Sequence, residues 1–200
     1  MASAAEKLRY DTLDDFLAIP EGERFHELLS GEIVEKASPV ARHGGSQIKL
    51  GRSLGPFDRR PGGSGGAGGW RFASECEVQL AEHTVVRPDV AGWRRERLPR
   101  LPDTFPCLVR PDWVCEILSR SNAVTDLLDK VRIYHQAGVP HYWILDPDRE
   151  TLRVHRWAEP GYQVVLDVGH HAVVRAEPFD AIEIAVIDLF DQGDELDQPV

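Results

Sequence analysis

The chain has 200 residues, a formal net charge of −10, and 42% hydrophobic residues. This length and composition predict one domain spanning 1–200, folded over about 10–190, with an acidic tail at 191–200. No apolar run approaches the roughly 20 residues of a membrane span, and the first residues lack a signal-peptide pattern. The negative charge argues against a surface that grips nucleic acid through many phosphate contacts. It does not exclude an enzyme whose acidic pocket becomes competent when a metal binds.

Two residue types add to this picture. Cys76, Cys107 and Cys115 are odd in number and share no C-x-x-C spacing, so we predict reduced thiols in a cytoplasmic protein without a structural zinc site. Lysine is scarce, because only four of the 23 basic residues are lysines. They are Lys7, Lys36, Lys49 and Lys130. A chain this biased towards arginine is expected to keep lysine where arginine would not do the same job.

The first half of the chain alternates helical and strand-like patterns. Apolar spacing and turn residues predict, in order, a helix over 12–19, a hairpin of strands 25–29 and 32–35, a helix over 44–57 that begins near Ser46, and a glycine-rich loop over 62–69. Ile48, Leu50 and Leu54 are the apolar positions of the second helix.

The second half is richer in strands. The predicted elements are strands over 70–80, 85–93 and 112–118, with an Arg/Pro-rich loop over 94–111, then a helix over 122–136, strands over 141–146, 151–157, 162–166 and 172–176, and a short helix near 187–190. The predicted fold class is therefore α/β (α+β), with a mixed central sheet flanked by helices and an additional antiparallel meander.

Two acidic residues stand out from this pattern. Asp89 follows Pro88 at the end of a strand-like run, and Glu116 lies inside the apolar run 113–118. A carboxylate in an apolar strand is costly unless it is paired or bound to a cation. If the two strands are neighbours, Asp89 and Glu116 form a pocket suited to a hard divalent metal such as Mg²⁺ or Mn²⁺. The backbone carbonyl of Ile117 is a natural third ligand.

Hydrolysis of a phosphodiester needs such a metal and also a positioned cation near the attacking oxygen. Strand alternation places Glu116 and residue 118 on one face, so an E-x-K pattern would need lysine at 118. This chain has Leu118 there. The cation must come from elsewhere, and Lys130 is the candidate because its helix follows the strand of Glu116 and can lean back over it.

Several motifs now resemble a known family in their order along the chain. They are Glu27-Leu-Leu-Ser-Gly-Glu, Arg87-Pro-Asp, Val114-Cys-Glu-Ile-Leu-Ser, Asp129-Lys-Val-Arg-Ile-Tyr and Ala137-Gly-Val-Pro-His-Tyr-Trp-Ile-Leu-Asp. Together they cover roughly residues 10–190 and resemble the Uma-type restriction endonucleases of the PD-(D/E)XK nuclease superfamily.

The resemblance implies a restriction-endonuclease-like fold with Asp89 and Glu116 as metal ligands. It also implies a lysine that has moved from the strand to the helix, which matches Lys130. Glu27 matches an acidic residue on an early segment of that family, where it completes the metal site or orients water. The departure from the superfamily pattern is Leu118, so Lys130 would reach the water by a different path.

Each residue also has a structural alternative. Asp89 can begin a turn, and Glu116 can pair with a buried arginine. Lys130 can form an exposed pair with Asp126 on the helix surface. Glu27 can be an ordinary strand residue that faces water.

Further residues were weighed as nucleic-acid contacts. His43 can contact a phosphate or base, or be a solvent-facing residue near a helix start. Arg94 and Arg95 begin a basic loop beside Asp89 that can follow a nucleic-acid backbone or simply be solvated. The aromatic residues Tyr134, Tyr142 and Trp143 are interpreted as core residues.

The sequence thus predicts an endonuclease that cleaves DNA with a divalent-metal-activated water. The alternative is a non-catalytic nuclease-fold module for binding or assembly, which the charge of −10 and the missing lysine at 118 favour. A nuclease component of a mobile element or toxin system is a third reading. DNA is the expected partner, no membrane is expected, and a homodimer is left open because restriction-type enzymes often dimerise to cut both strands.

Overall fold

A six-stranded sheet forms the centre of the protein in the computed structural model, which describes residues 10–36, 38, 40–61, 67–119 and 125–191. Its described strands follow the order β10-β9-β8-β7-β6-β3. Their bounds are β3 Trp70–Ser74, β6 Val90–Arg94, β7 Trp113–Ile117, β8 His141–Asp146, β9 Thr151–Arg156 and β10 Gln163–Gly169. Only β7 and β8 pair in parallel among these described neighbours. The mixed central sheet and the antiparallel run from β8 to β10 confirm the predicted fold class.

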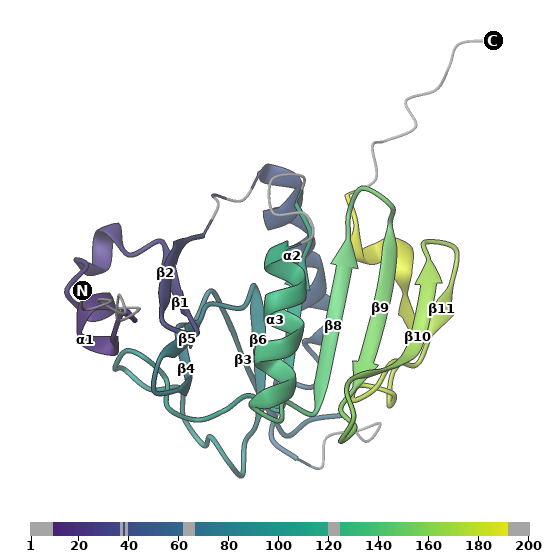
Figure 1. The fold of residues 1–200 in the computed structure, drawn as a ribbon. Helices are drawn as coiled ribbons and strands as arrows, with labels where there is room; N and C mark the ends of the chain where they lie inside the picture. Colours follow the sequence, from purple (N-terminus) through teal and green to yellow (C-terminus); the bar gives the residue numbers. More distant parts are fainter. Residues whose placement is uncertain (1–9, 37, 39, 62–66, 120–124, 192–200) are drawn as a thin grey trace, which may run out of the picture.

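A second sheet of four antiparallel strands lies beside the first (Figure 1). Its described strands, in spatial order, are β2 Glu32–Glu35, β1 His26–Leu29, β5 Thr84–Val86 and β4 Val78–Ala81. The short helix α1 Leu13–Leu17 packs against it, with Thr12 and Asp15 forming a capping box. The 3-10 turn η1 Glu21–Glu23 leads into β1. The predicted hairpin of β1 and β2 is confirmed.

Two helices cover opposite faces of the central sheet (Figure 1). Helix α3 Thr125–Gln136 connects the parallel strands β7 and β8, as a parallel pair requires. Helix α2 Ala41–Leu54 lies behind the sheet in the view of Figure 1. The strands β11 Val173–Val174 and β12 Ile184–Ala185 and the 3-10 turn η2 Val186–Leu189 complete the described fold. No helix in the described residues is long and apolar enough to cross a membrane.

The structure breaks two runs that the sequence pattern predicts as single strands. The run 70–80 is split into β3 and β4, which belong to different sheets. The run 85–93 is split into β5 and β6 at Arg87-Pro88-Asp89, where proline cannot donate to a strand ladder. The chain therefore passes between the sheets twice, at 75–77 and at 87–89. Both passages lie next to each other, since the Glu75 N–H donates to the Asp89 carbonyl.

The start of α2 also differs from its prediction. The helix begins at Ala41, before Ser46, and it includes Gly44 and Gly45. Isolated helix propensity disfavours the two glycines, but burial of the helix against the sheet outweighs it. Of the three apolar positions of this helix, Leu50 and Leu54 are buried, whereas Ile48 is 76% exposed. The predicted helix start at residue 122 and the acidic tail after residue 191 lie outside the described residues.

An aromatic cluster fixes the face of the sheet that α2 covers. The Phe179 ring is fully buried and lies 4.9–5.6 Å, between ring centroids, from five other aromatic rings. Those rings belong to Phe57, Trp70, Phe72, Trp113 and Trp143. This contact joins the chain after β11 to strands from both halves of the sheet.

We expect the substitution Phe179→Ala to lower the free energy of unfolding by about 3–5 kcal/mol, since it opens a cavity among rings that cannot easily collapse. Urea denaturation followed by tryptophan fluorescence measures this loss. Leu128→Ala is the control, because Leu128 is 59% exposed and its truncation is expected to change the free energy by less than about 0.5 kcal/mol. Equal losses in the two variants would contradict the role given to Phe179.

Candidate functional site

Asp89 and Glu116 lie opposite each other at the ends of neighbouring strands. The antiparallel register of β6 and β7 pairs Val90 with Cys115, and the next step outward brings Asp89 opposite Glu116. Opposed residues of an antiparallel pair have their side chains on one face. Strand pairing therefore brings the two carboxylates near each other, with Glu116 on β7 and Asp89 immediately before its neighbour β6.

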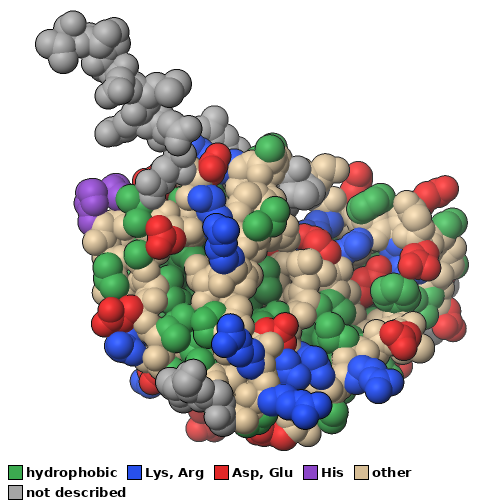
Figure 2. Space-filling model, turned by 180° about the vertical axis from the view of Figure 1, so that it is seen from behind, with side chains coloured by type: hydrophobic (Ala, Val, Ile, Leu, Met, Phe, Trp, Pro, Cys, Tyr) green, Lys and Arg blue, Asp and Glu red, His purple; other side chains and the backbone are tan. Residues whose placement is uncertain are grey.

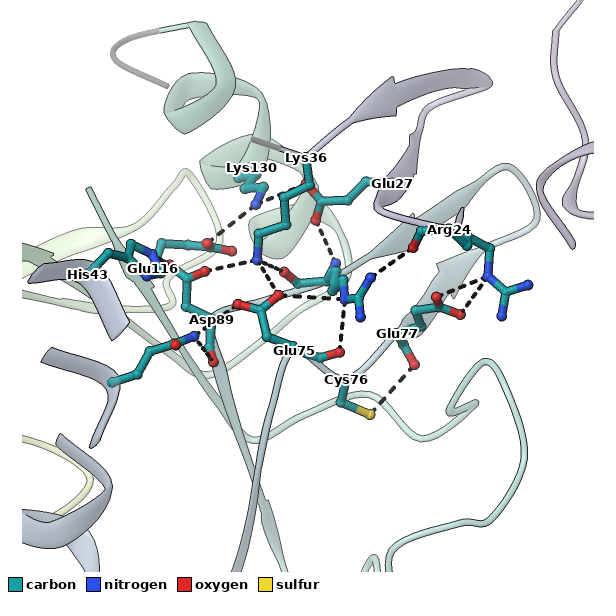
Figure 3. Close-up of polar contacts among 12 residues, drawn as sticks. Arg24, Glu27, Lys36, His43, Glu75, Cys76, Glu77, Asp89, Glu116 and Lys130 are labelled. Atoms are coloured by element: carbon teal, nitrogen blue, oxygen red, sulfur yellow. Dashed lines mark hydrogen bonds and ion pairs between the residues drawn. The ribbon is translucent and has the colours of Figure 1, made fainter. Parts of the chain in front are cut away.

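Asp89 is 2% exposed and accepts hydrogen bonds at both carboxylate oxygens. The Oδ2 atom accepts from the backbone N–H of Ile117 at 2.6 Å and lies 3.0 Å from Nε2 of His43. The Oδ1 atom accepts from Nζ of Lys36 at 2.8 Å. Asp89 lies in a bend after Pro88, yet its side chain is enclosed by partners from three elements (Figure 3). The simple turn residue considered as an alternative does not describe it.

Glu116 is buried on the face of β7 that α3 covers. Its Oε1 atom accepts from the Tyr134 hydroxyl at 2.6 Å, and its Oε2 atom lies 3.3 Å from Nζ of Lys130. Both partners come from α3, on one helical face four residues apart. The described partners of Glu116 are thus a lysine and a tyrosine, and the alternative pairing with a buried arginine is not seen in the described residues.

Lys130 joins the two sheets. It is 3% exposed, and its Nζ atom also lies 3.0 Å from Oε2 of Glu27 on β1. The other oxygen of Glu27 accepts from the backbone N–H of Arg87 in the second passage between the sheets. Glu27 itself is 3% exposed, so it is not a water-facing strand residue. Glu27, Asp89, Glu116 and Lys130 thus lie in one region of the structure (Figure 3).

A second lysine approaches from the end of β2. The three N–H donors of the Lys36 ammonium group are all satisfied, by Asp89 Oδ1, by Glu75 Oε2 at 2.9 Å and by the Arg87 carbonyl at 2.7 Å. Gln47 of α2 holds the other oxygen of Glu75 at 2.9 Å and the Asp89 carbonyl at 3.0 Å. Two lysines from different sheets thus flank the pair of carboxylates.

The surroundings shift the pKa values of these groups in opposite directions. Burial would raise the pKa of Asp89, but the His43 hydrogen bond and the Lys36 ammonium group outweigh it and hold that pKa below its usual range. Burial raises the pKa of Glu116 to about 7, against the attraction of Lys130 and with the repulsion of Asp89. Burial would lower the pKa of Lys36, but the charges of Asp89 and Glu116 outweigh it and raise that pKa.

The donor atoms of this site fit Mg²⁺ or Mn²⁺. Two carboxylates offer hard oxygen donors, and Mg²⁺ commonly takes one or two protein carboxylates and keeps several waters. Among the described residues, no group of three or more His, Cys, Asp and Glu side chains is placed to hold a metal ion. The protein ligands available here are therefore few. The Ile117 N–H already serves Asp89, and the ligand role of its carbonyl stays a prediction.

A cavity of about 340 Å³ opens next to these residues. Its walls come from the start of α2, the end of β7 and the turn after β8, and they include Arg42, His43, Leu118, Ser119 and Asp148. His43 belongs both to this cavity and to the partners of Asp89. The cavity therefore reaches one partner of Asp89, while neither carboxylate lines it.

The structure corrects two expectations about basic and aromatic residues. His43 is 5% exposed and faces Asp89, so the solvent-facing alternative is wrong. Arg94 and Arg95 do not lie beside Asp89, because they follow it by the length of β6, about 16 Å at the usual strand rise. Arg94 lies over the Trp70 ring, and Arg95 bonds Asp58. Figure 2 shows Lys and Arg side chains grouped in the lower part of the back face.

Four residues that hold the carboxylates of this site are not among the site residues predicted from the sequence. They are Lys36, Gln47, Glu75 and Tyr134. Tyr134 was interpreted as a core aromatic residue, and its ring does pack against Tyr142 while its hydroxyl serves Glu116. The scarcity of lysine was the one sequence signal that pointed to Lys36 as well as Lys130. No local pattern pointed to Gln47 or Glu75.

Comparison with known proteins places the chain in a family. The Uma2 family, described as "putative restriction endonuclease", matches residues 13–186. The chain belongs to the Uma2 family. A crystal structure of a "putative nuclease belonging to DUF820" from Anabaena variabilis has a TM-score of 0.72 and 26% sequence identity, and covers 90% of this chain and 97% of its own. No curated protein matches the chain. Membership of the Uma2 family confirms the predicted resemblance and supports a nuclease-like function.

In this Uma2 protein we expect Tyr134→Phe to lower the free energy of unfolding by about 1–3 kcal/mol, since Glu116 loses a buried donor. Urea denaturation in metal-free buffer measures the loss. Tyr10→Phe makes the same chemical change at a side chain that is 58% exposed, and it is expected to stay within about 0.5 kcal/mol. A Tyr134→Phe variant as stable as the control would show that the hydroxyl contributes little.

Proposed function

We propose that this protein is a Mg²⁺- or Mn²⁺-dependent endonuclease that hydrolyses phosphodiester bonds of DNA. The observation that carries the proposal is the meeting of Asp89 and Glu116 beside Lys130 at one end of the central sheet. Membership of a family described as restriction endonucleases supports it. Perturbed carboxyl groups gathered in one place are also typical of functional sites.

Asp89 and Glu116 would hold the divalent ion, with the Ile117 carbonyl as a further donor. When bound, the ion would acidify a water and offset charge on the phosphate. Asp89 is prepared for this role because His43 and the Ile117 N–H fix the direction of its carboxylate. A fixed carboxylate loses little freedom when it binds a cation.

Lys130 would donate to the attacking water or to the phosphate. Its ammonium group is held at 3.0 Å from Glu27 and 3.3 Å from Glu116, so its position is set before substrate arrives. A preorganised cation stabilises negative charge that develops in the transition state. Glu27 would act as a positioning residue, because its two oxygens orient Lys130 and the Arg87 N–H.

The substrate would enter through the cavity beside His43. Arg42 on its wall is half exposed and pairs with Asp148, so it is available to exchange that partner for a phosphate. Arg94 and Arg95 lie at the far end of β6 and are not proposed to touch the scissile group. A homodimer that cuts both strands stays a prediction, and sedimentation of the purified chain would test it.

We expect Asp89→Asn and Glu116→Gln each to reduce nicking of supercoiled plasmid by about a hundredfold or more, because each removes a ligand charge. The assay uses Mg²⁺ and Mn²⁺, with EDTA as the metal-free reaction. Asp167→Asn is the matched control, since Asp167 lies on β10 in a half-exposed pair with Arg153. Full activity in both site variants would overturn the assignment, and circular dichroism would show that each variant is folded.

Lys130→Met is expected to reduce nicking by about a hundredfold while Mn²⁺ binding is retained, because the lysine is proposed to act on the water or phosphate and not on the ion. Lys49→Met is the control for the same charge change on α2. If Lys130→Met cleaves as fast as Lys49→Met, the catalytic cation lies elsewhere.

A second candidate function is a non-catalytic binding or assembly module. The net charge of −10 favours it, and so does the pairing of both carboxylates with lysines. Calorimetric titration with Mn²⁺ separates the two functions. Binding that is lost in Asp89→Asn supports the nuclease, and absence of any Asp89-dependent binding supports the module.

A further inference from the structure

Lys36 occupies one oxygen of the carboxylate that is proposed to hold the metal. The Oδ2 atom of Asp89 carries the bonds from His43 and from the Ile117 N–H. The Oδ1 atom carries the bond from the Lys36 ammonium group at 2.8 Å. The Lys36 side chain is 11% exposed, so this contact is enclosed and little weakened by solvent.

This ammonium group and a divalent ion cannot share Oδ1 at low cost. Two positive charges a few ångströms apart in a buried site repel each other strongly. The ammonium group is held by three acceptors, so it does not leave without replacing a hydrogen bond to a charged group. One of these acceptors, Glu75, is more exposed than Asp89 and holds the ammonium group at 2.9 Å.

We propose that Lys36 is a built-in competitor of the divalent metal, an internal cation that neutralises Asp89 until the ion displaces it towards Glu75. The inference rests on the proposed function, because it concerns the affinity of the same site for its metal. This role of Lys36 is distinct from that of the lysine in the E-x-K pattern of the nuclease superfamily. Metal binding is then an exchange of cations at Asp89.

Lys130 is not equivalent to Lys36 in this respect. Its ammonium group lies between Glu27 and Glu116 and is held by two buried carboxylates from different sheets. Removal of Lys130 leaves two carboxylates without their cation, whereas removal of Lys36 exposes the Asp89 oxygen that faces the ion. Only Lys36 is therefore inferred to compete with the ion for that oxygen, and Lys130→Met is expected to retain Mn²⁺ binding.

The test is isothermal titration calorimetry of the metal-free chain with MnCl₂. Loss of one charged hydrogen bond corresponds to about a tenfold change in an equilibrium constant. We therefore expect Lys36→Met to bind Mn²⁺ about tenfold more tightly than wild type, and Lys49→Met to bind as wild type does. The metal-free Lys36→Met chain should also unfold at a lower temperature, and Mn²⁺ should raise its unfolding temperature by more than that of wild type.

Each outcome separates the inference from the proposed function. Asp89-dependent binding in wild type with equal or weaker affinity in Lys36→Met would overturn the inference alone. No binding in either chain would overturn the proposed function and the inference with it. Binding in Lys36→Met but not in wild type would support the inference in its strongest form. Lys36→Gln, which keeps one amide donor for Asp89, provides a folded substitute if Lys36→Met does not fold.

Discussion

The burial of the Asp89 carboxylate is the constraint on which the rest of the site depends. A charge that is 2% exposed is costly unless hydrogen bonds and an opposite charge replace water. Asp89 obtains them from the His43 imidazole, the Ile117 N–H and the Lys36 ammonium group. These partners come from α2, β7 and the end of β2, so one carboxylate connects three separate parts of the chain. The need to satisfy it fixes how the two sheets and α2 meet.

The two passages of the chain between the sheets provide the geometry. At 75–77 and again at 87–89 the backbone leaves one sheet and enters the other. Each passage carries an acidic residue of the site, Glu75 in the first and Asp89 in the second. Pro88 interrupts the strand ladder next to Asp89, which frees the following turn to direct the carboxylate inward. A continuous strand through 85–93 would have kept this region within one sheet and away from Lys36.

Sequence reasoning succeeded where chemistry and local pattern agree. Glu116 stands out because an acid inside an apolar run is expensive, and strand alternation places it on the α3 face with Val114. Lys130 was inferred because residue 118 is leucine, and the structure brings its ammonium group to Glu116. The hydrogen-bonded partners of Asp89 could not be predicted in this way. Lys36, His43 and Gln47 lie between 42 and 53 residues before Asp89 in the chain. Only the tertiary fold brings them to it.

The dependence on tertiary contacts also explains why the position of the basic loop and the start of α2 were predicted wrongly. The basic loop that begins at Arg94 is close to Asp89 in sequence, but the strand between them carries it to the other end of the sheet. Helix α2 begins before the position that its glycines suggest, because burial of His43 and Ser46 against the sheet decides its start. In each case a tertiary contact outweighed a local preference. Alternation within a strand could be read from sequence, whereas the point where a strand ends depended on the neighbouring sheet.

Charge balance ties these observations together. Three buried carboxylates, Glu27, Asp89 and Glu116, lie beside the buried ammonium group of Lys130 and the partly buried one of Lys36, so the carboxylates outnumber these ammonium groups. Burial raises the pKa of Glu116 to about 7, and the neighbouring Asp89 adds to the shift. In the proposed function, a divalent ion at Asp89 and Glu116 would offset this excess of negative charge. A phosphodiester, itself an anion, would then be held best with the ion already bound.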